Sequence, residues 1–483
     1  MGVTMVISFF TTRITLQVLG VEDYGLNNLV SSVVSMFGFI NASMGTAVQR
    51  FFSIEIGKNR IDSLSKIFGS GFYLHVIVAI ITFIIAEIFA VFFLSKLNIP
   101  SERLFAAHVV FQISAFSLVV NILNVPFLAL LRAREEFSKV AILDVVQALM
   151  RLGVLFLLYS IDFDKLISLS ALNFGISLSY VLGVFLLAKR YEEARIEFVR
   201  DKEIINKMLS FISMLLFTVM ASVFNKQGIV IVVNLFFGLT INAAYAIAFQ
   251  VSQVIETFAM SFKQAVVPQL MAAYGEGNRE RMNSLVFIGT KVSFLLMMLI
   301  SIPIIFEADH ILKFWLEAPP KYASQFTMWV LISVNINTFS YFVYQSVHAT
   351  GRIKKLQLLT AATFLLSVLI VYASFNLGGG FLYAVYVPIV FSLIRCWIVV
   401  FCAKEAIDLN IHVFMKQIVG RSVLLVVILV AVSMYVHFLL KESLLRFFVI
   451  FVLNAIFTLA GGYYLLFNAV ERNTLYGLVK SVD

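Results

Sequence analysis

Long apolar runs recur along the whole chain and are separated by short polar stretches. Each run has about the 20 residues that an α-helix needs to cross a bilayer. The predicted spans are 1–18, 25–47, 67–95, 105–131, 140–160, 166–188, 209–235, 241–268, 285–308, 324–348, 356–376, 381–403, 421–440 and 447–467. The runs do not alternate between polar and apolar residues, which excludes the strands of a membrane barrel. The pattern predicts an all-α polytopic membrane protein with about 14 transmembrane helices.

The composition agrees with this class, because 61% of the 483 residues are hydrophobic and only 13% are charged. The first run lacks a basic region before it and a small-residue cleavage site after it, so we expect a retained helix rather than a signal peptide. The two cysteines, Cys396 and Cys402, lie on different faces of one span, and the histidines are scattered. We therefore expect no disulfide, metal or other cofactor.

The loops carry an uneven distribution of basic residues. If both termini are cytoplasmic, the inner loops and the tail hold 23 lysines and arginines, and the outer loops hold 7. Because cytoplasmic loops are enriched in these residues, both termini are predicted to be cytoplasmic, in a plasma membrane. The net charge of +9 then reflects topology and does not indicate nucleic-acid binding.

The most charged stretch divides the spans into two groups. It predicts a cytoplasmic amphipathic linker, expected to be helical, at 189–208, between an N-terminal six-helix lobe at 1–188 and a C-terminal six-helix lobe at 209–403. Two further helices and a cytoplasmic tail occupy 404–483. None of the loops is large enough for a soluble domain, so chemistry would have to take place in the membrane.

The two predicted lobes show weak internal similarity. The segment LGVEDYG, a long span and GKNR are echoed by FGLTINA, a long span and EGNR, and Gly20 matches Gly238 at an offset of 218 residues. An even number of spans separates the repeats, so they begin on the same side of the membrane. Such parallel repeats place a substrate site between the halves, near the bilayer midplane.

Basic residues inside the spans are the main candidates for chemistry. A charge on a transmembrane helix costs about 3 kcal/mol or more, so it faces a hydrated interior or a partner. The six embedded bases are Arg13, Arg151, Lys226, Lys263, Lys291 and Arg395. Arg50 lies just past the inner end of the second span. Arg151 and Arg395 are too far from either end of their spans to reach an interface, whereas Lys291 is expected to be peripheral.

Only three acids, Glu87, Asp144 and Glu256, lie at comparable depth. Asp144 shares a helix face with Arg151, and Glu256 shares one with Lys263, so interhelical ion pairs are an alternative explanation for Arg151 and Lys263. Three acids cannot neutralise six bases. The surplus predicts a hydrated cavity that attracts phosphates, with Asp144 and Glu256 as candidate sites for coupling to a proton or sodium gradient.

The opening residues TTRITLQVLGVEDYGLNNLVSSVVSMFGFINASMGTAVQRFFSIEIGKNR resemble a known family. Their span-loop-span layout, with TTR, LGVEDYG and QRFFS, is similar to bacterial polysaccharide-biosynthesis flippases of the multidrug/oligosaccharidyl-lipid/polysaccharide exporter superfamily. The resemblance implies two six-helix lobes around a cavity that opens alternately to each side. It also implies an undecaprenyl-diphosphate-linked repeat unit of O-antigen or capsule as substrate.

By helix position, the resemblance implies that Arg13, Arg50 and Lys263 bind the diphosphate. The inclusion of Arg151, Lys226 and Arg395 rests on their depth instead. A lipid-linked oligosaccharide has an anionic head for a cationic cavity and a tail that remains in the bilayer. Expected partners are this substrate, membrane lipids, and the polymerase and glycosyltransferases of the pathway, in a bacterial inner membrane.

Two other functions remain open. A cation-coupled multidrug exporter of the same superfamily usually carries acidic residues where this chain has Arg13 and Lys226. A membrane-embedded polymerase or glycosyltransferase would need acid-base groups on the outer side, where the longest loop, 309–323, supplies few. We therefore expect a transporter rather than an enzyme.

Overall fold

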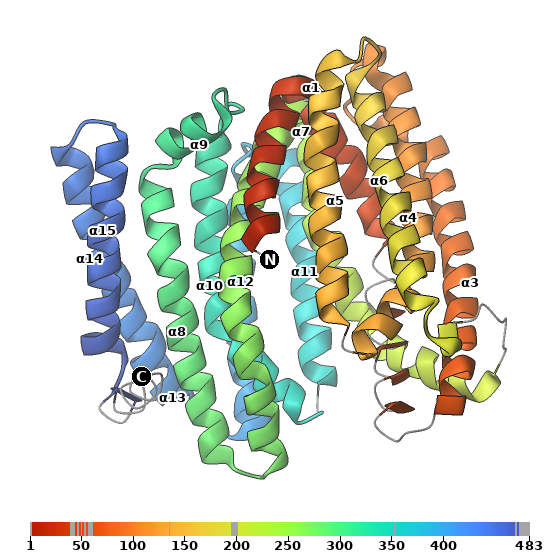
Figure 1. Cartoon of the computed structure of the whole chain (residues 1–483). Coiled ribbons are helices and arrows are strands. Elements are labelled where there is room, and N and C mark those ends of the chain that lie inside the picture. The colour runs from red at the N-terminus through yellow and green to blue at the C-terminus, as the bar shows by residue number, and fades with distance from the viewer. Residues whose placement is uncertain are drawn as a thin grey trace. The chain divides into compact units, whose positions relative to one another are not determined.

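The computed structural model describes residues 2–38, 44–45, 48–49, 51–52, 55–56, 61–134, 136–194, 201–351, 353–468 and 471–472. The regular elements in these residues are α-helices joined by short 3-10 and π-helical turns, and no strand occurs among them (Figure 1). This confirms the predicted all-α fold class. The chain forms two compact units, Met1–Ala243 and Ala244–Asp483.

Eleven helices in the described part of the chain are long and apolar enough to cross a membrane. One of them, Val219–Gln264, has 46 residues, which corresponds to about 69 Å of helix at 1.5 Å per residue. The hydrocarbon core of a bilayer is about 30 Å thick, so this segment has room for two crossings. It belongs to α7 (Lys202–Gly275). The predicted spans 209–235 and 241–268 thus lie in one kinked helix.

Two glycines interrupt the two longest helices. Gly20 in α1 (Gly2–Phe37) has φ 75° and ψ 174°, and Gly238 in α7 has φ 77° and ψ −170°. These positive φ values strain any residue with a Cβ, whereas glycine adopts them readily. The same two glycines are matched by the internal repeat. The repeat therefore includes a shared backbone kink between two consecutive spans.

In its described residues the first unit contains α1, the first part of α7, and four long helices between them. The four are α3 (Ile61–Phe93), α4 (Leu104–Ala133), α5 (Phe137–Leu157) and α6 (Lys165–Ala188). Within it α4 packs on α3 and α6, and α1 packs on α5 and α4.

Asparagines attach the start of α7 to this unit. Asn234 accepts a hydrogen bond from the backbone N–H of Asn98 at 3.1 Å and donates to the Asn98 carbonyl at 3.2 Å. Asn28 donates to Asn242 at 3.2 Å. Residues 209–243, which the sequence analysis assigns to the second lobe, therefore belong to the first unit by their contacts.

The second unit contains the end of α7 and the remaining helices. They are α8 (Arg279–Phe306), α9 (Ala308–Leu316), α10 (Ala323–Ala349), α11 (Lys354–Asn376), α12 (Tyr383–Ile407), α13 (Ile411–Phe414), α14 (Arg421–Leu439) and α15 (Leu444–Gly461). Within this unit α10 packs between α8 and α12, and α14 and α15 pack on α8.

Polar contacts fix the last two helices to α8. Asn454 of α15 donates hydrogen bonds to the carbonyls of Met298 and Leu299 at 3.2 and 3.1 Å. Leu299 lies four residues before Pro303, which has no N–H to donate to it. Glu307, buried at the end of α8, pairs with Arg446 of α15 at 2.7 Å. The predicted extra helices are therefore integral to the second unit.

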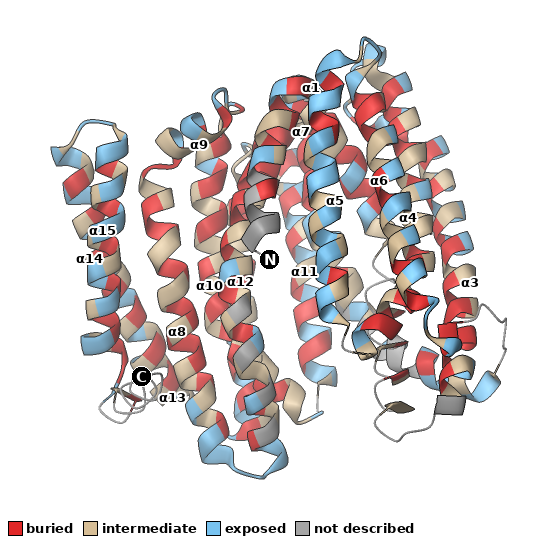
Figure 2. Ribbon diagram, in the orientation of Figure 1, coloured by how far each residue is buried: buried red, intermediate tan, exposed pale blue. Residues whose placement is uncertain are grey.

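Figure 2 shows exposed positions along the described helices, and many of the exposed residues are large and apolar. On α3, for example, Ile80, Ile84 and Ile88 are each more than half exposed. In water such a continuous apolar surface would be unfavourable, whereas in a bilayer it faces lipid tails. The burial pattern is that of a protein whose solvent is the membrane.

The predicted amphipathic helix at the linker does not form in its described first part. Residues Lys189–Ala194 make turns that include the short 3-10 helix Glu192–Ala194. Glu193 is buried there against Arg134, and the Tyr191 hydroxyl donates to Glu136 at 2.5 Å. These contacts to the loop before α5 hold the chain in a turn, and the next helix, α7, begins at Lys202.

Candidate functional site

Helices of the first unit carry stripes of small polar side chains. On α1, Tyr24, Asn27, Ser31 and Ser35 are spaced three or four residues apart and so share one face. The stripes on α4 and α6 are Ser114, Ser117, Asn121 and Ser170, Asn173, Ser177. Such polar stripes inside apolar spans must face protein or water rather than lipid.

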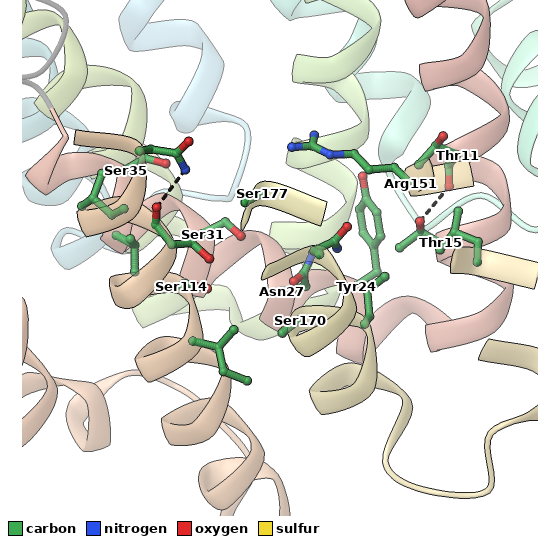
Figure 3. Close-up of a pocket in the computed structure, with 18 of the residues that line it drawn as sticks. Thr11, Thr15, Tyr24, Asn27, Ser31, Ser35, Ser114, Arg151, Ser170 and Ser177 are labelled. Carbon is green, nitrogen blue, oxygen red and sulfur yellow. Dashed lines mark hydrogen bonds between the residues drawn. The ribbon is translucent and has the colours of Figure 1, made fainter. Parts of the chain in front are cut away.

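The stripes surround a pocket with a volume of about 590 Å³ (Figure 3). Thr11, Thr12 and Thr15 of α1 extend its wall before the Gly20 kink, and α5 contributes Arg151. Arg151 is the one charged residue among those that line the pocket, and its guanidinium points away from its own helix toward the serine-bearing side (Figure 3). The pocket is therefore polar and cationic.

Arg151 has no hydrogen-bond or ion-pair partner among the described residues. Asp144, seven residues earlier on α5, instead accepts a hydrogen bond from the Tyr180 hydroxyl at 3.0 Å. The described residues therefore form no interhelical ion pair with Arg151, the alternative raised from the sequence. Two helical turns are too long a distance for Asp144 to neutralise it.

A charged cluster connects α1, just after its Gly20 kink, to the N-terminal ends of α4 and α6. Arg103, which precedes α4, donates to Asp23 of α1 at 2.8 Å and to Asp164 at 2.5 Å. Asp164 also caps α6 by accepting from the backbone N–H groups of Leu166 and Ile167. One guanidinium between two carboxylates thus fixes the spacing of α1, α4 and α6.

The two carboxylates of this cluster differ electrostatically. Partial burial raises the pKa of Asp164, but hydrogen bonds from Arg103 and from the α6 N-terminus outweigh it, so its pKa lies below the ordinary value. Burial raises the pKa of Asp23 above its ordinary value despite Arg103. Of the two carboxylates, the ionised Asp164 is therefore the one that stabilises the fold at neutral pH.

In the second unit, two predicted bases approach one face of α10. Arg395 of α12 donates to Asn337 at 3.0 Å and stacks over Phe364 with its guanidinium carbon 4.3 Å from the ring centre. Lys263 of α7 places its Nζ 4.8 Å from the ring centre of Tyr341. Asn337 and Tyr341 are four residues apart, so they lie one turn apart on the same side of α10.

Neither of these bases forms an ion pair among the described residues, although Lys263 is only 6% exposed. Glu256, the acid predicted as its partner, acts on Lys263 through its charge but accepts its hydrogen bond from Gln253 at 3.5 Å. Glu87 likewise accepts from Gln112 at 2.9 Å. Each of the three embedded acids thus accepts from a neutral side chain, and the described residues form no ion pair with Lys263.

The other candidate residues have different surroundings. Arg13 is half-buried on α1 near the threonines but is not part of the pocket wall. Lys226 is exposed on α7. Arg50 lies outside the described residues. The structure brings Lys263 and Arg395 to one helix face and places Arg151 in a pocket, and Arg13, Lys226 and Asp144 are not among the described residues that line this pocket.

Lys291, expected to be peripheral, is instead fully buried in the second unit. Its Nζ donates to both carboxylate oxygens of Glu471 at 2.8 and 2.7 Å. Glu471, which belongs to the predicted cytoplasmic tail, is buried in the second unit. The embedded Lys291 is a structural anchor with its own counterion.

The hydroxyl and amide residues of the pocket were not predicted from the sequence. Their signal was present, because serines and asparagines recur at intervals of three and four residues within otherwise apolar spans. A search for charged residues alone passes over it.

Membrane-spanning helices that enclose polar, cationic sites define a polytopic membrane transporter. The chain belongs to the MatE family, whose model matches residues 1–157 and 210–373. It is therefore a transporter of the multidrug/oligosaccharidyl-lipid/polysaccharide exporter superfamily. No curated protein matches the chain.

Solved structures share the fold at low sequence identity. "Lipid II flippase MurJ, inward closed conformation" is 16% identical with a TM-score of 0.72, covering 95% of this chain and 96% of that chain. An inward-facing multidrug resistance MATE family transporter is 14% identical with a TM-score of 0.70, covering 85% and 96%. A transporter of the superfamily from Pyrococcus furiosus, described as having a binding pocket of reverse polarity, is 13% identical with a TM-score of 0.59, covering 84% and 95%.

Proposed function

We propose that this protein is a flippase for lipid-linked oligosaccharides, moving an undecaprenyl-diphosphate-linked repeat unit from the cytoplasmic to the outer leaflet by alternating access. The substrate would have a diphosphate and sugars too polar to cross the bilayer unaided. The protein would supply a cationic path for this head group while the lipid tail stays in the membrane. No covalent chemistry is needed, so the protein is not an enzyme in this account.

The observation that carries the proposal is the presence of embedded bases that form no ion pair within the part of the chain that the structure describes. Arg151, Lys263 and Arg395 form no ion pair among the described residues, and the three embedded acids accept from neutral groups. Keeping an unpaired charge at this depth costs several kcal/mol, on the order of 3 per residue on insertion scales. An anionic substrate would offset this cost by supplying the missing charge.

We assign diphosphate binding to Arg13, Arg50 and Lys263, with Lys226 and Arg395 as further cationic residues along the path. The cation–π contact with Tyr341 positions the Lys263 ammonium without neutralising it, so its three N–H donors stay available to phosphate oxygens. Arg395 is held more firmly, by Asn337 and Phe364. Lys263 is thus the better candidate for a direct phosphate contact.

The second unit also offers a place for the lipid tail. An apolar groove of about 620 Å³ lies between α14 and α15 and is lined by residues such as Ala431, Leu439, Leu453 and Phe457. Both helices are long and apolar enough to span the membrane. A groove without polar walls at this depth suits a hydrocarbon chain, and we place the isoprenoid tail there.

The remaining parts of the proposal follow from the substrate. Repeat units are made at the cytoplasmic face of a bacterial inner membrane and joined outside, so we place the protein there with both termini cytoplasmic. The partners would be glycosyltransferases before it and a polymerase after it. Asp144 and Glu256 are the candidate residues for coupling transport to a proton or sodium gradient.

A cation-coupled multidrug exporter is the second candidate function. The MATE transporter fold matches almost as closely as the flippase fold, with TM-scores of 0.70 and 0.72. The residue types favour the flippase, because exporters of cationic drugs usually carry acidic residues where this chain has the bases Arg13 and Lys226. We therefore rank it second.

The proposal is tested by a flipping assay with purified protein in liposomes that contain a fluorescent undecaprenyl-diphosphate oligosaccharide. We expect Lys263→Gln to reduce the initial rate at least tenfold, because a buried ammonium would no longer meet the phosphates. The matched control is Lys207→Gln, which removes an exposed lysine paired with Glu203 outside the predicted spans. Equal rates for Lys263→Gln and the control would contradict the assigned role of Lys263.

A further inference from the structure

The pocket of the first unit, formed by α1, α4, α5 and α6, has a chemistry of its own. Six of its polar side chains make no side-chain hydrogen bond among the described residues: Asn27, Ser31, Ser35, Ser114, Asn173 and Ser177. Others, such as Thr15, return their hydroxyl to a backbone carbonyl of their own helix. The first set therefore has donors and acceptors directed at whatever fills the pocket, and in a membrane protein such groups must find a partner.

The pocket is large compared with the needs of a single ion. Its volume of about 590 Å³ corresponds to about 20 water molecules at about 30 Å³ each. It also lies within the usual size range of small-molecule sites, roughly 300 to 1,000 Å³. A simple ion would engage only a few of the six unpartnered groups. Many hydroxyls and amides spread over several helices instead suit a ligand that carries many hydroxyls itself.

Arg151 adds one positive charge to this wall, and the described residues that line the pocket include no carboxylate to balance it. A guanidinium presents a fork of donors that matches a carboxylate or phosphate group in two parallel hydrogen bonds. The Tyr24 side chain lies on the same wall and offers an aromatic surface (Figure 3). The complementary ligand therefore carries one anionic group on a polyhydroxylated body.

We propose that this pocket binds an acidic sugar, that is, a saccharide residue bearing one carboxylate or phosphate, with Arg151 holding the anionic group. The serines and asparagines of α1, α4 and α6 hold its hydroxyls. The idea that this pocket holds a sugar of the transported repeat unit rests on the proposed function. The binding of an acidic sugar does not rest on it, because that binding follows from the residues that line the pocket, all of which lie in the first unit.

The test uses the full-length protein in detergent micelles and saturation-transfer NMR, with glucuronate as the probe. Glucose controls for the sugar body without charge, and acetate controls for the charge without the sugar. We expect saturable binding of glucuronate at least tenfold tighter than that of either control. Equal binding of acetate would overturn the sugar part of the proposal, and equal binding of glucose would overturn the role of the charge.

Variants assign the binding to this pocket. Arg151→Gln should weaken glucuronate binding at least tenfold and leave glucose binding unchanged. Arg151→Lys should weaken glucuronate binding less than Arg151→Gln does, because it keeps the positive charge. Arg132→Gln, at an exposed arginine near the end of α4, is the control and should bind as the unmodified protein does. If Arg151→Gln does not fold, Ser177→Ala and Asn173→Ala replace it and should each weaken binding severalfold. Glucuronate binding that none of these pocket variants changes would overturn the proposal.

The same samples separate this proposal from the proposed function. If the unmodified protein flips lipid-linked oligosaccharide but does not bind glucuronate, the pocket assignment alone is overturned. If the unmodified protein binds glucuronate through the pocket residues but does not flip lipid-linked oligosaccharide, the transport function is overturned and the pocket assignment stays intact.

Discussion

The contact between α15 and the proline-containing end of α8 yields a prediction that can be worked out in free energy. Pro303 cannot donate to the Leu299 carbonyl, and the buried Asn454 amide donates to that oxygen at 3.1 Å and to the Met298 carbonyl at 3.2 Å. Asn454→Leu keeps the volume but removes both donors. A neutral hydrogen bond contributes about 1 kcal/mol, and about 0.6 kcal/mol on average between membrane helices. We therefore expect a loss of about 1–2 kcal/mol in the free energy of unfolding.

The proline makes a sharper test possible, through a double-mutant cycle with Pro303→Ala. Alanine restores an N–H four residues after Leu299, so the carbonyl no longer depends on Asn454. In the Pro303→Ala background, Asn454→Leu should therefore lower the free energy of unfolding by about 0.5–1 kcal/mol less than it does in the unmodified protein. This difference is the energy of one such hydrogen bond.

Reversible unfolding in mixed detergent micelles measures all four free energies. The matched control is Leu459→Ala, which alters an exposed position of α15 and should show no coupling to Pro303→Ala. Strict additivity of Asn454→Leu and Pro303→Ala would refute the reasoning.

Three further predictions concern the anchors and close contacts described above. Lys291→Met alone should destabilise the protein by about 3–5 kcal/mol because it leaves Glu471 buried and unpaired, and the added change Glu471→Leu should recover most of this in the same unfolding assay. The pKa of Asp164 is lowered by folding, so its contribution is present above the ordinary carboxyl pKa of about 3.9 and is lost as the pH falls through the lower folded value. The difference in melting temperature between the unmodified protein and Asp164→Asn should therefore be constant from pH 5 to 7 and shrink below pH 4, and a difference that grows on acidification would contradict the sign. Gly25→Ala places a Cβ 2.3 Å from the Leu239 carbonyl oxygen and should destabilise by about 1–3 kcal/mol, whereas Gly153→Ala, which meets nothing within 4 Å, should be neutral or stabilising in the same melts.

Most of the fold could be predicted from the sequence because the bilayer imposes a simple rule on length and polarity. Predicted spans such as 105–131 and 324–348 agree with α4 and α10 to within two residues. The repeat found through Gly20 and Gly238 proved to mark two matching kinks. The linker was less predictable, because the tertiary contacts of Tyr191 and Glu193 prevail there over helix propensity.

The candidate site was predictable only in part. Depth identified Arg151, Lys263 and Arg395 as embedded charges, but it could not distinguish them from Lys291, whose partner Glu471 is 180 residues away in sequence. Which acid pairs with which base depends on the tertiary structure. A count of the embedded acids and bases in the sequence therefore gives only the excess of bases over acids. The pocket around Arg151 was missed because its other members are uncharged and carry information only through their helical spacing.

The measurement that tests the central claim most directly compares two substrates in the same proteoliposomes of the unmodified protein. One is a fluorescent undecaprenyl-diphosphate oligosaccharide, and the other is a lipophilic cationic dye with an imposed proton or sodium gradient. We predict flipping of the oligosaccharide above the rate in protein-free liposomes and no transport of the dye. Gradient-driven dye transport without flipping of the oligosaccharide would contradict the account and identify the protein as a multidrug exporter.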